Sequence, residues 1–300
     1  MLTYRQRDTI REAMDSVLAQ NCRFSWEILV GDDDSDDGTA DIVQHYCVRQ
    51  PERCFLFRRT SNVGPTRNAA SLIQHARGRY VAFLEGDDCW TDPDKLQLQV
   101  SHLQQNPDCS LVYHACAMVD GQEKTLAILR EKGPLRTLTD LFPRGNRDMA
   151  TSSMVGVNLY KLHSHWLRYF TYSRYVGDIP LKAAYLKEGR IDYLDRCMSR
   201  YRKQTLGGAS YSAMDLNIQR LDTVCAYRAV HDLYGGVGCE GADLMQMRVL
   251  RDILESFCRM QRPDLGRALW KKLTEQERLR YLEWRQSPEG QTAPLPPAVE

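Results

Sequence analysis

The sequence has 300 residues, a formal net charge of +1 and 43% hydrophobic residues. This length allows one large domain or one domain with an appendage, and the balanced charge gives no general attraction to nucleic acid, so no nucleic-acid partner is expected. No apolar run is long enough to span a bilayer, and the ten cysteines form no CxxC pair, which disfavours a zinc site and favours reduced thiols. Because no apolar signal-peptide region opens the chain either, we expect a cytoplasmic protein.

The first part of the chain alternates predicted strands and helices. Strand residues are predicted at 1–4, 26–30, 54–57 and 80–84. Between them, apolar side chains recur at the spacing of one helix face. Alternation of this kind predicts an α/β fold, with a mostly parallel sheet that helices cover on both faces.

The stretch around which the chain is organised follows the last of these strands. It contains Glu85, Asp87 and Asp88, then Asp92, at which the next helix is expected to open. Ligands of open α/β sheets bind at the carboxyl ends of strands, and carboxylates this close repel one another unless a cation or a proton lies between them. A hard divalent metal that bridges substrate phosphates explains the pattern. The alternative is an acidic surface turn in which Asp92 only caps the helix.

A second acidic loop, residues 32–38, follows the strand predicted at 26–30. Its spacing from Asp33 fits the first half of an EF-hand, but Gln44 stands where the bidentate glutamate belongs, so that type of calcium site is excluded. Asp33 could accept hydrogen bonds from a nucleobase or ribose, or the loop could be a solvated turn before a helix N-terminus. Arg67, at the start of a later helix, offers a planar fork of donors for a diphosphate, although a lone arginine is more often a surface residue.

Together, three stretches resemble the family 2 inverting glycosyltransferases of the GT-A fold. They are Val30–Thr39, Asn62–Asn68 and Gly78–Trp90, which follow one another in the order and separation of that family. The resemblance runs from Thr3 to about residue 212 and implies a Rossmann-like, mixed sheet. Because relatives carry further apolar residues before the position of Thr3, we expect the first strand to be truncated, and whether the first Met is the native start stays open.

The resemblance also implies roles for individual residues. Six side chains are expected to bind a nucleotide-sugar donor, with Tyr4 and Asp33 at the nucleobase, Arg67 or Asn68 at the nucleotide, and Glu85 and Asp87 at the position of the family's DxD motif. Asp87 and Asp88 are expected to bind Mg²⁺ or Mn²⁺, which stabilises the charge that develops on the leaving nucleoside diphosphate. Which acid contacts the metal stays open, because a glutamate at the first position has a longer arm than the usual aspartate.

The second half of the chain is expected to supply the part of the site that binds the sugar acceptor. Gly177 and Asp178 open a predicted helix that stops near Gly189. An acid at this place in the family is the catalytic base, so Asp178 is expected to take the proton of the acceptor hydroxyl in a single inverting displacement. The alternative is that Asp178 only caps the helix. Gln204 stands where relatives commonly carry a histidine that could bind the metal, which leaves the full metal coordination open.

The pattern changes after residue 212. Apolar side chains at helical spacing predict helices at 218–228, 244–257, 265–273 and 275–285, which together form a helical extension over residues 213–286. Residues 287–300 contain four prolines and predict a disordered tail. The helices could pack on the catalytic domain, on a partner transferase, or peripherally on the inner face of the cell membrane, although mixed charges on the last helix favour a solvated face.

The sequence therefore predicts a metal-dependent glycosyltransferase that moves a sugar from a nucleotide-diphosphate sugar to a glycan or lipid-linked acceptor in bacterial surface-polysaccharide synthesis. One alternative is a catalytically inactive nucleotide-binding or scaffold relative, which Gln204 and the truncated first strand would suit. Another is a nucleotidyltransferase, which shares the metal-binding carboxylates. That class relies on a glycine-rich loop after its first strand, where this chain reads Thr3–Arg7 without glycine.

Overall fold

A small parallel sheet opens the fold. The computed structural model describes residues 1–130, 133–142, 149–203 and 214–296. The first sheet has the order β1-β2-β3, with β1 at Leu2–Thr3, β2 at Ile28–Asp32 and β3 at Cys54–Arg58. The register pairs Leu2 with Gly31 and Ile28 with Cys54, and all three strands run in the same direction. Their carboxyl ends, which carry the predicted donor-binding loops, therefore meet at one edge.

A second, mixed sheet follows. Its order is β4-β8-β6-β9-β5, with β7 paired to β6. The strands are β4 (Tyr80–Ala82), β5 (Cys89–Trp90), β6 (Cys109–Val119), β7 (Thr125–Leu129), β8 (Val155–Val157) and β9 (Arg190–Arg202). The long strands β6 and β9 are parallel, whereas β4–β8, β6–β8, β5–β9 and β6–β7 are antiparallel pairs. The predicted α/β class with a mixed sheet is confirmed, and antiparallel pairing predominates in this second sheet.

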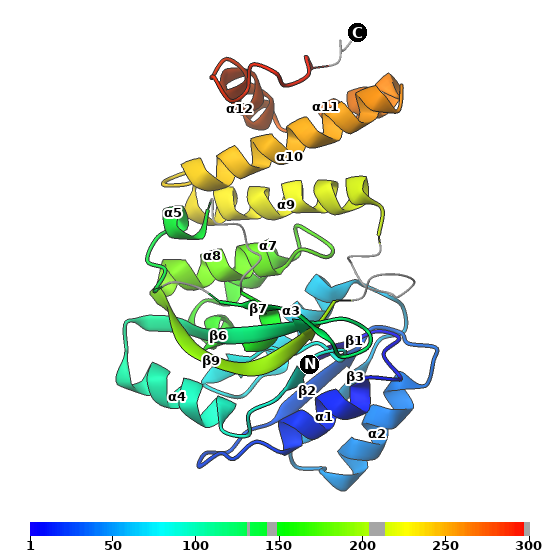
Figure 1. The fold of residues 1–300 in the computed structure, drawn as a ribbon, viewed down its shortest axis with the longest axis vertical. Coiled ribbons are helices and arrows are strands. Elements are labelled where there is room, and N and C mark those ends of the chain that lie inside the picture. Colours follow the sequence, from blue (N-terminus) through cyan, green and yellow to red (C-terminus); the bar gives the residue numbers. More distant parts are fainter. Residues whose placement is uncertain (131–132, 143–148, 204–213, 297–300) are drawn as a thin grey trace.

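The first strand lies at the seam between the two sheets (Figure 1). One edge of β1 pairs with β2. On its other edge, the N–H of Leu2 donates to the carbonyl of Leu84 at 3.0 Å, and the N–H of Gly86 donates to the carbonyl of Leu2 at 2.8 Å. The ammonium group of Met1 donates to the carbonyl of Leu29 at 2.6 Å, and burial lowers its pKa to about 6. The acidic stretch after Leu84 is therefore fixed directly to the first strand.

Helices cover both faces of the sheets, and β6 separates the two cores (Figure 1). On one face lie α3 (Pro65–His75), α7 (Leu167–Phe170) and α8 (Asp178–Glu188), and on the other lie α1 (Ile10–Leu18), α2 (Thr39–Arg49) and α4 (Lys95–Gln105). Leu111 and Tyr113 of β6 pack into the first core, whereas Val112 between them packs into the second. Because successive side chains of a strand point to opposite faces, this alternation gives each helix layer its own core.

Shorter helical segments connect these elements. They are α5 (Leu138–Leu141), α6 (Leu159–Leu162) and two 3₁₀ turns at Thr151–Ser153 and Ser164–Trp166. The helix that the sequence predicts from Asp92 begins three residues later, at Lys95. Asp92 instead accepts the N–H of Asp94 at 3.0 Å and forms an ion pair with Arg196, so its carboxylate closes the turn before the helix.

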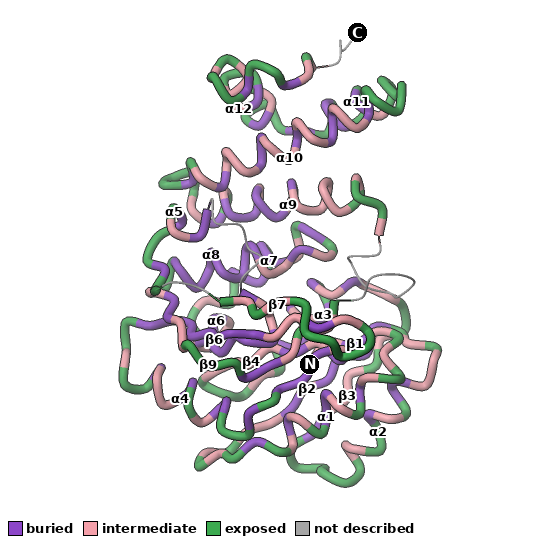
Figure 2. The backbone as a smooth tube through the Cα atoms, in the orientation of Figure 1, coloured by how far each residue is buried: buried purple, intermediate pink, exposed green. Residues whose placement is uncertain are grey.

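The C-terminal part consists of stacked helices, which confirms the predicted helical appendage. They are α9 (Leu216–Tyr234), α10 (Glu240–Arg259), α11 (Pro263–Lys272) and α12 (Glu275–Arg285). The hydroxyl of Tyr234 donates to the carbonyl of Ala183 at 2.9 Å, and Lys187 Nζ donates to the carbonyl of Leu233 at 2.6 Å, which joins α9 to α8. Figure 2 shows α8 largely buried between the sheet and α9. Within the described residues, every helix is too short or too polar to cross a membrane.

The segment after α12 folds back onto that helix. The sequence predicts a disordered tail over 287–300, but Ala293 is buried, and its carbonyl accepts a hydrogen bond from Arg285 Nε at 2.9 Å. The hydroxyl of Tyr281 donates to the carbonyl of Pro294 at 3.2 Å. As far as residue 296 the structure differs from the predicted disorder, because a turn returns the chain to the apolar side of α12.

The contact between α9 and α12 generates a test of the helical stack. Arg228 donates to both carboxylate oxygens of Glu277 at 2.7 Å, and the Glu277 side chain is only 1% exposed. Glu277→Ala would leave the guanidinium without its counter-charge, so we expect the free energy of unfolding to fall by about 3 kcal/mol in urea unfolding. The matched control is Glu275→Ala, an exposed residue of the same helix, which should cost less than about 0.5 kcal/mol. Equal losses in the two variants would contradict a fixed contact.

Candidate functional site

The acidic stretch forms a turn between β4 and β5, beside the end of β1. The N–H of Asp88 donates to the carbonyl of Glu85 at 3.1 Å, which closes the turn. A Cβ atom at Gly86 would lie 2.5 Å from Gln6 Oε1 and 3.0 Å from Thr3 Oγ1, so a larger residue would have to displace these side chains beside the end of β1. Glu85, Asp87 and Asp88 are thus held together, and we call these three residues the acidic turn.

Burial makes charge on the acidic turn costly. Burial, followed by the charge of Asp87, raises the pKa of Glu85 to about 7, and Asp178 adds to this shift. Burial, followed by the charges of Asp87 and Glu85, also raises the pKa of Asp88. In the described part of the chain, Glu85 Oε2 and Asp88 Oδ2 are buried without a hydrogen-bond partner. Clustered carboxylate oxygens in this state suit a hard divalent cation.

Arg202, the last residue of β9, holds one side of the acidic turn. Its N–H donates to Asp88 Oδ1 at 2.9 Å, and its guanidinium donates to the carbonyl of Asp87. The same guanidinium forms ion pairs with Glu12 and Glu123, which restrict its position. Sequence reasoning gave this arginine no role. Its place two residues before the position of the family's histidine is the signal that could have found it.

Asp178 lies near the acidic turn at the start of α8. Lys182, one helix turn later, donates from Nζ to Asp178 Oδ2 at 3.2 Å and to the carbonyl of Met149 at 2.9 Å. The Lys182 side chain is fully buried, whereas 31% of the Asp178 side chain is exposed, so the lysine supports the carboxylate from the protein interior. Burial lowers the pKa of Lys182, an effect that Asp178 and Glu85 oppose. The N-cap position belongs to Gly177, which removes the alternative of Asp178 as the helix cap.

Asp33, after β2, shapes a neighbouring turn of the backbone. Its Oδ1 and Oδ2 accept the N–H groups of Val63 and Gly64, each at 2.9 Å, and the residue is only 3% exposed. A carboxylate oxygen can accept more than one hydrogen bond. The predicted contact of Asp33 with a nucleobase stays a prediction, and it would have to use the remaining lone pairs.

Tyr4 stands where β1 ends, next to the loop that follows β2. The guanidinium of Arg5 lies 5.3 Å from the centroid of the Tyr4 ring and donates to both carboxylate oxygens of Asp36, at 2.8 and 2.7 Å. Arg5 and Asp34 have positive φ angles of 53° and 67°. Such backbone conformations are costly for residues with side chains and concentrate at ligand sites. This edge of the sheet is therefore a reasonable place for the predicted nucleobase contact of Tyr4.

The structure separates the two residues predicted to face the nucleotide. Arg67 is exposed on the first turn of α3, whereas Asn68 is 1% exposed. Asn68 Nδ2 donates to the carbonyl of Gly31 at 2.8 Å, and Asn68 Oδ1 accepts from Arg59 Nε at 3.3 Å. A Cβ atom at Gly31 would lie 2.3 Å from Asn68 Oδ1, so the glycine permits this contact. Asn68 therefore supports the end of β2 through its amide, and its predicted contact with the nucleotide stays a prediction.

Two further residues belong to the sequence around residue 202. Gln204, predicted to replace a metal-binding histidine, lies outside the described residues. Tyr201 received no role from the sequence. Burial, followed by the charges of the acidic turn and of Asp178, raises its pKa. A neutral hydroxyl among carboxylates can donate a hydrogen bond to one of them, so Tyr201 is a further candidate for the site.

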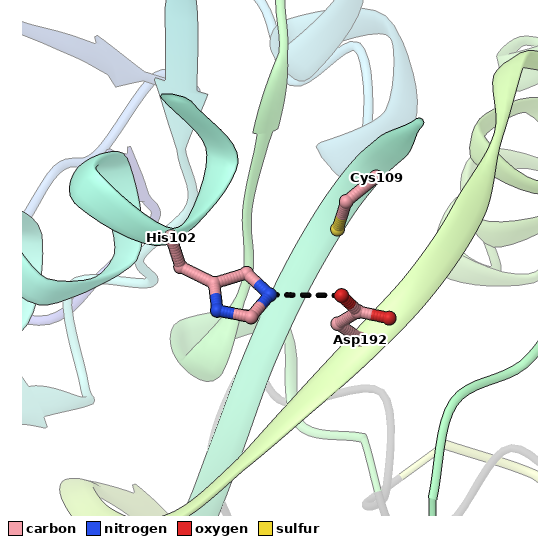
Figure 3. Close-up of side chains that lie close together, drawn as sticks. All are labelled: His102, Cys109 and Asp192. Carbon is pink, nitrogen blue, oxygen red and sulfur yellow. Dashed lines mark hydrogen bonds and ion pairs between the residues drawn. The ribbon is translucent and has the colours of Figure 1, made fainter. Parts of the chain in front are cut away.

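A second group of possible metal ligands lies at the other end of β6 and β9 (Figure 3). His102, Cys109 and Asp192 place one ligand atom each within 4.8 Å of one another. His102 Nε2 lies 2.8 Å from Asp192 Oδ2, and Arg190 Nε donates to Asp192 Oδ1 at 2.7 Å. Burial opposes ionisation of Asp192, but the hydrogen bonds from Arg190 and His102 outweigh it and lower its pKa. Since these partners already neutralise Asp192, we assign the group a structural role. Roughly 30 Å of strand separates it from Arg202.

Comparison with known proteins decides the family. The family model described as Glycosyl transferase family 2 matches residues 1–165, which is more than half of the 300 residues. The chain belongs to glycosyl transferase family 2. The resemblance inferred from the acidic loops is confirmed, and the nucleotidyltransferase alternative is set aside.

Several family 2 relatives match part of the chain. It is 38% identical over 103 residues to the putative teichuronic acid biosynthesis glycosyltransferase TuaG of Bacillus subtilis, covering 34% of this chain and 40% of TuaG. It is 34% identical over 106 residues to the UDP-Glc:alpha-D-GlcNAc-diphosphoundecaprenol beta-1,3-glucosyltransferase WfgD of Escherichia coli, covering 35% and 40%. An uncharacterized protein of Mycobacterium tuberculosis is 37% identical over 118 residues, covering 39% and 34%. The chain thus spans about two fifths or less of these relatives' length.

Solved structures extend the likeness beyond the region of sequence similarity. The structure of S. aureus TarS 1-349 in complex with UDP-GlcNAc matches with a TM-score of 0.58 and 17% identity, covering 94% of this chain and 77% of that one. The structure of TarS 1-349 with UDP matches with a TM-score of 0.55 and 16% identity. At this level of identity the likeness establishes the fold, and the expected GT-A architecture is confirmed.

The raised pKa of Glu85 predicts how stability depends on pH. Its ordinary value is 4.5 and its value in the fold is about 7, so its stabilising contribution is fully present below 4.5 and is lost as the pH rises through 7. Without metal, Glu85→Gln should therefore be more stable than the wild type by about 3 kcal/mol near pH 8, but only by about 1 kcal/mol near pH 5. Urea unfolding at both pH values measures the difference.

The control for this prediction is Glu52→Gln, which removes an exposed carboxylate far along the chain from the acidic turn. It should change stability by the same small amount at both pH values. A difference between Glu85→Gln and the wild type that does not grow with pH would show that Glu85 ionises as an ordinary surface group.

Proposed function

We propose that this protein transfers a sugar, with inversion, from a nucleoside-diphosphate sugar to a hydroxyl group of a glycan or lipid-linked acceptor. The observation that carries the proposal is the approach of Asp178, backed by the buried Lys182, to the three carboxylates of the acidic turn. Membership of glycosyl transferase family 2 supports glycosyl transfer. The names of TuaG and WfgD refer to teichuronic acid biosynthesis and to a diphosphoundecaprenol-linked acceptor, which supports a place in surface-polysaccharide synthesis.

The donor would bind along the edge at which β1 and β2 end. We propose that Tyr4 and Asp33 contact the nucleobase and that Arg67, exposed at the start of α3, reaches toward the diphosphate. The strained backbone of Arg5 and Asp34 at this edge supports a ligand site. TarS, which has the same fold, has been solved with UDP and with UDP-GlcNAc, and this supports a nucleotide-sugar donor for the present chain.

Mg²⁺ or Mn²⁺ fits the chemistry of the acidic turn. Buried oxygens of Glu85 and Asp88 have no hydrogen-bond partner among the described residues, and hard divalent cations prefer such oxygen ligands. We propose that Asp87 and Asp88 hold the cation while Glu85 faces the donor. The cation would neutralise negative charge on the leaving nucleoside diphosphate. Arg202 would keep both aspartates in place through its contacts with Asp88 Oδ1 and the Asp87 carbonyl.

Asp178 would act as the general base. The bond between the acceptor oxygen and the anomeric carbon forms while the bond between that carbon and the phosphate oxygen breaks, and the acceptor proton passes to the Asp178 carboxylate. A single displacement from the side opposite the leaving group inverts the anomeric carbon. Lys182 would orient the carboxylate through Oδ2, and the 31% of the Asp178 side chain that is exposed would be open to an acceptor.

We propose that the chain has three parts. Residues 1–212 would form the glycosyltransferase domain, residues 213–286 the helical extension, and residues 287–300 a C-terminal tail. Cytoplasmic localisation stays a prediction, as does contact of the extension with a membrane surface or a partner transferase.

Metal-dependent release of nucleoside diphosphate from a panel of nucleotide sugars tests the donor class and the acidic turn. The wild type should release it with Mg²⁺ or Mn²⁺ and lose this activity in EDTA. Asp87→Ala should lower the rate about a hundredfold or more, because it removes a carboxylate proposed to hold the cation that stabilises the leaving group. Asp94→Ala, an exposed aspartate of the same segment, should keep the wild-type rate. Nucleotide binding without release by the wild type would instead favour the scaffold alternative.

The role of Asp178 is tested by an isosteric change. Asp178→Asn should lower kcat about 10²–10⁴-fold, because an amide cannot take the acceptor proton, and should leave donor affinity unchanged. The comparison variant is Asp195→Asn, which alters an exposed aspartate of β9. NMR of the anomeric proton of the product measures inversion. A retained configuration, or full turnover by Asp178→Asn, would rule out the single-displacement mechanism with this base.

A further inference from the structure

One carboxylate of the C-terminal helices gathers four hydrogen bonds from a single turn of the chain. Asp222 Oδ2 accepts the hydroxyl of Ser173 at 2.7 Å and the N–H groups of Tyr175 and Val176, each at 2.8 Å. Asp222 Oδ1 accepts the N–H of Arg174 at 2.7 Å. Successive N–H groups that converge in this way form a nest for an anion, and hydrogen bonds to an ionised acceptor are stronger than neutral ones.

The turn held by Asp222, residues 173–176, leads directly into α8. Gly177 follows as the N-cap of α8, and Asp178 is the first residue of the helix. Val176 is buried and belongs to the core that α8 shares with the sheet. The position of this turn therefore determines where α8 begins and where its first carboxylate points.

The same turn contacts the loop that carries the predicted donor-binding residues. The hydroxyl of Thr66 donates to the carbonyl of Ser173 at 2.7 Å. Arg174 Nη2 donates to Asn62 Oδ1 at 2.7 Å and to the Asn62 carbonyl at 3.0 Å. Asp33 holds the same loop from its other side through two backbone N–H groups. The turn thus lies between the loop after β3 and the start of α8, and Asp222 fixes it from α9.

We propose that Asp222 is a positioning residue for Asp178, so that α9 of the C-terminal extension takes part in glycosyl transfer. This inference rests on the proposed function of Asp178 as the base. Without the Asp222 carboxylate, the N–H groups of Arg174, Tyr175 and Val176 lose the hydrogen bonds that it accepts, although Val176 still donates to the hydroxyl of Ser173 at 2.7 Å. The turn would then shift toward water or other partners. Small displacements of a catalytic group reduce the rate strongly, because the reacting atoms must be aligned.

A double-mutant cycle tests this proposal. Asp222→Ala should lower kcat about tenfold to a hundredfold and change the donor KM by a smaller factor. In the Asp178→Asn background, Asp222→Ala should have no further effect on kcat, because the group that it positions no longer acts as a base. A purely structural role would lower the rate by the same factor in both backgrounds, and that result would overturn the proposal.

The matched control is Asp252→Ala. Asp252 lies on the neighbouring helix α10 and pairs with Arg220 and Arg251, but it lies away from the 173–176 turn. Its loss should change kcat by less than about threefold, and equally in both backgrounds. A loss of kcat in Asp252→Ala that matches the loss in Asp222→Ala would show that the helical stack as a whole, and not this contact, sets the rate.

Two measurements keep the outcome interpretable. If Asp222→Ala does not fold by circular dichroism, the cycle is run with Asp222→Asn, which keeps one acceptor oxygen and should lose less activity than the alanine variant. Nucleoside-diphosphate release by the wild type distinguishes a failure of the Asp222 proposal from a failure of the proposed function. Release with additive losses in the cycle overturns only the role of Asp222, whereas no release by the wild type overturns the proposed function and this inference with it.

Discussion

Repulsion among carboxylates at the seam of two sheets is the constraint on which much of this structure depends. The acidic turn is held against β1 by backbone hydrogen bonds, and Gly86 gives room there for the side chains of Gln6 and Thr3. Because the backbone holds the three carboxylates close together, nearby positive charges are needed to offset their repulsion. Arg202 supplies one from the end of β9 and Lys182 another from the first turns of α8. The end of β9 and the start of α8 therefore serve the same purpose, since each places a basic side chain that offsets the repulsion among these carboxylates.

These compensating residues connect distant parts of the sequence. Arg202 forms an ion pair with Glu12, 190 positions earlier in the chain, and thereby joins α1 to the end of β9. Asp222 on α9 joins the C-terminal helices to the turn before α8. The Rossmann-like sheet provides the edge at which a donor could bind, whereas the elements that orient the proposed base come from outside the region matched by the family model, residues 1–165.

Local patterns in the sequence predicted much of the architecture, and the misses have physical causes. Alternating apolar runs indicated the strands and helices, and the acidic stretch indicated the centre of the site. The burial of Asn68 was not predictable, because it depends on the close approach of α3 to Gly31 of β2. Arg202 was missed because its role arises from charges far away in the chain. Lys182 was missed because its spacing from Asp178 does not reveal that the lysine is buried. The order of the segment up to residue 296 was missed because prolines alone do not reveal a turn that returns to a helix.

The burial of α8 on two sides has a consequence for how the chain can be divided. One flank of this helix packs on the sheet, and the other packs on α9 (Figure 2). A fragment that ended at residue 212 would expose the second flank to water, and apolar surface of that kind promotes aggregation. The region recognisable by sequence is thus shorter than the smallest unit that could be produced as a folded, isolated protein. A workable boundary for such a fragment lies beyond α9.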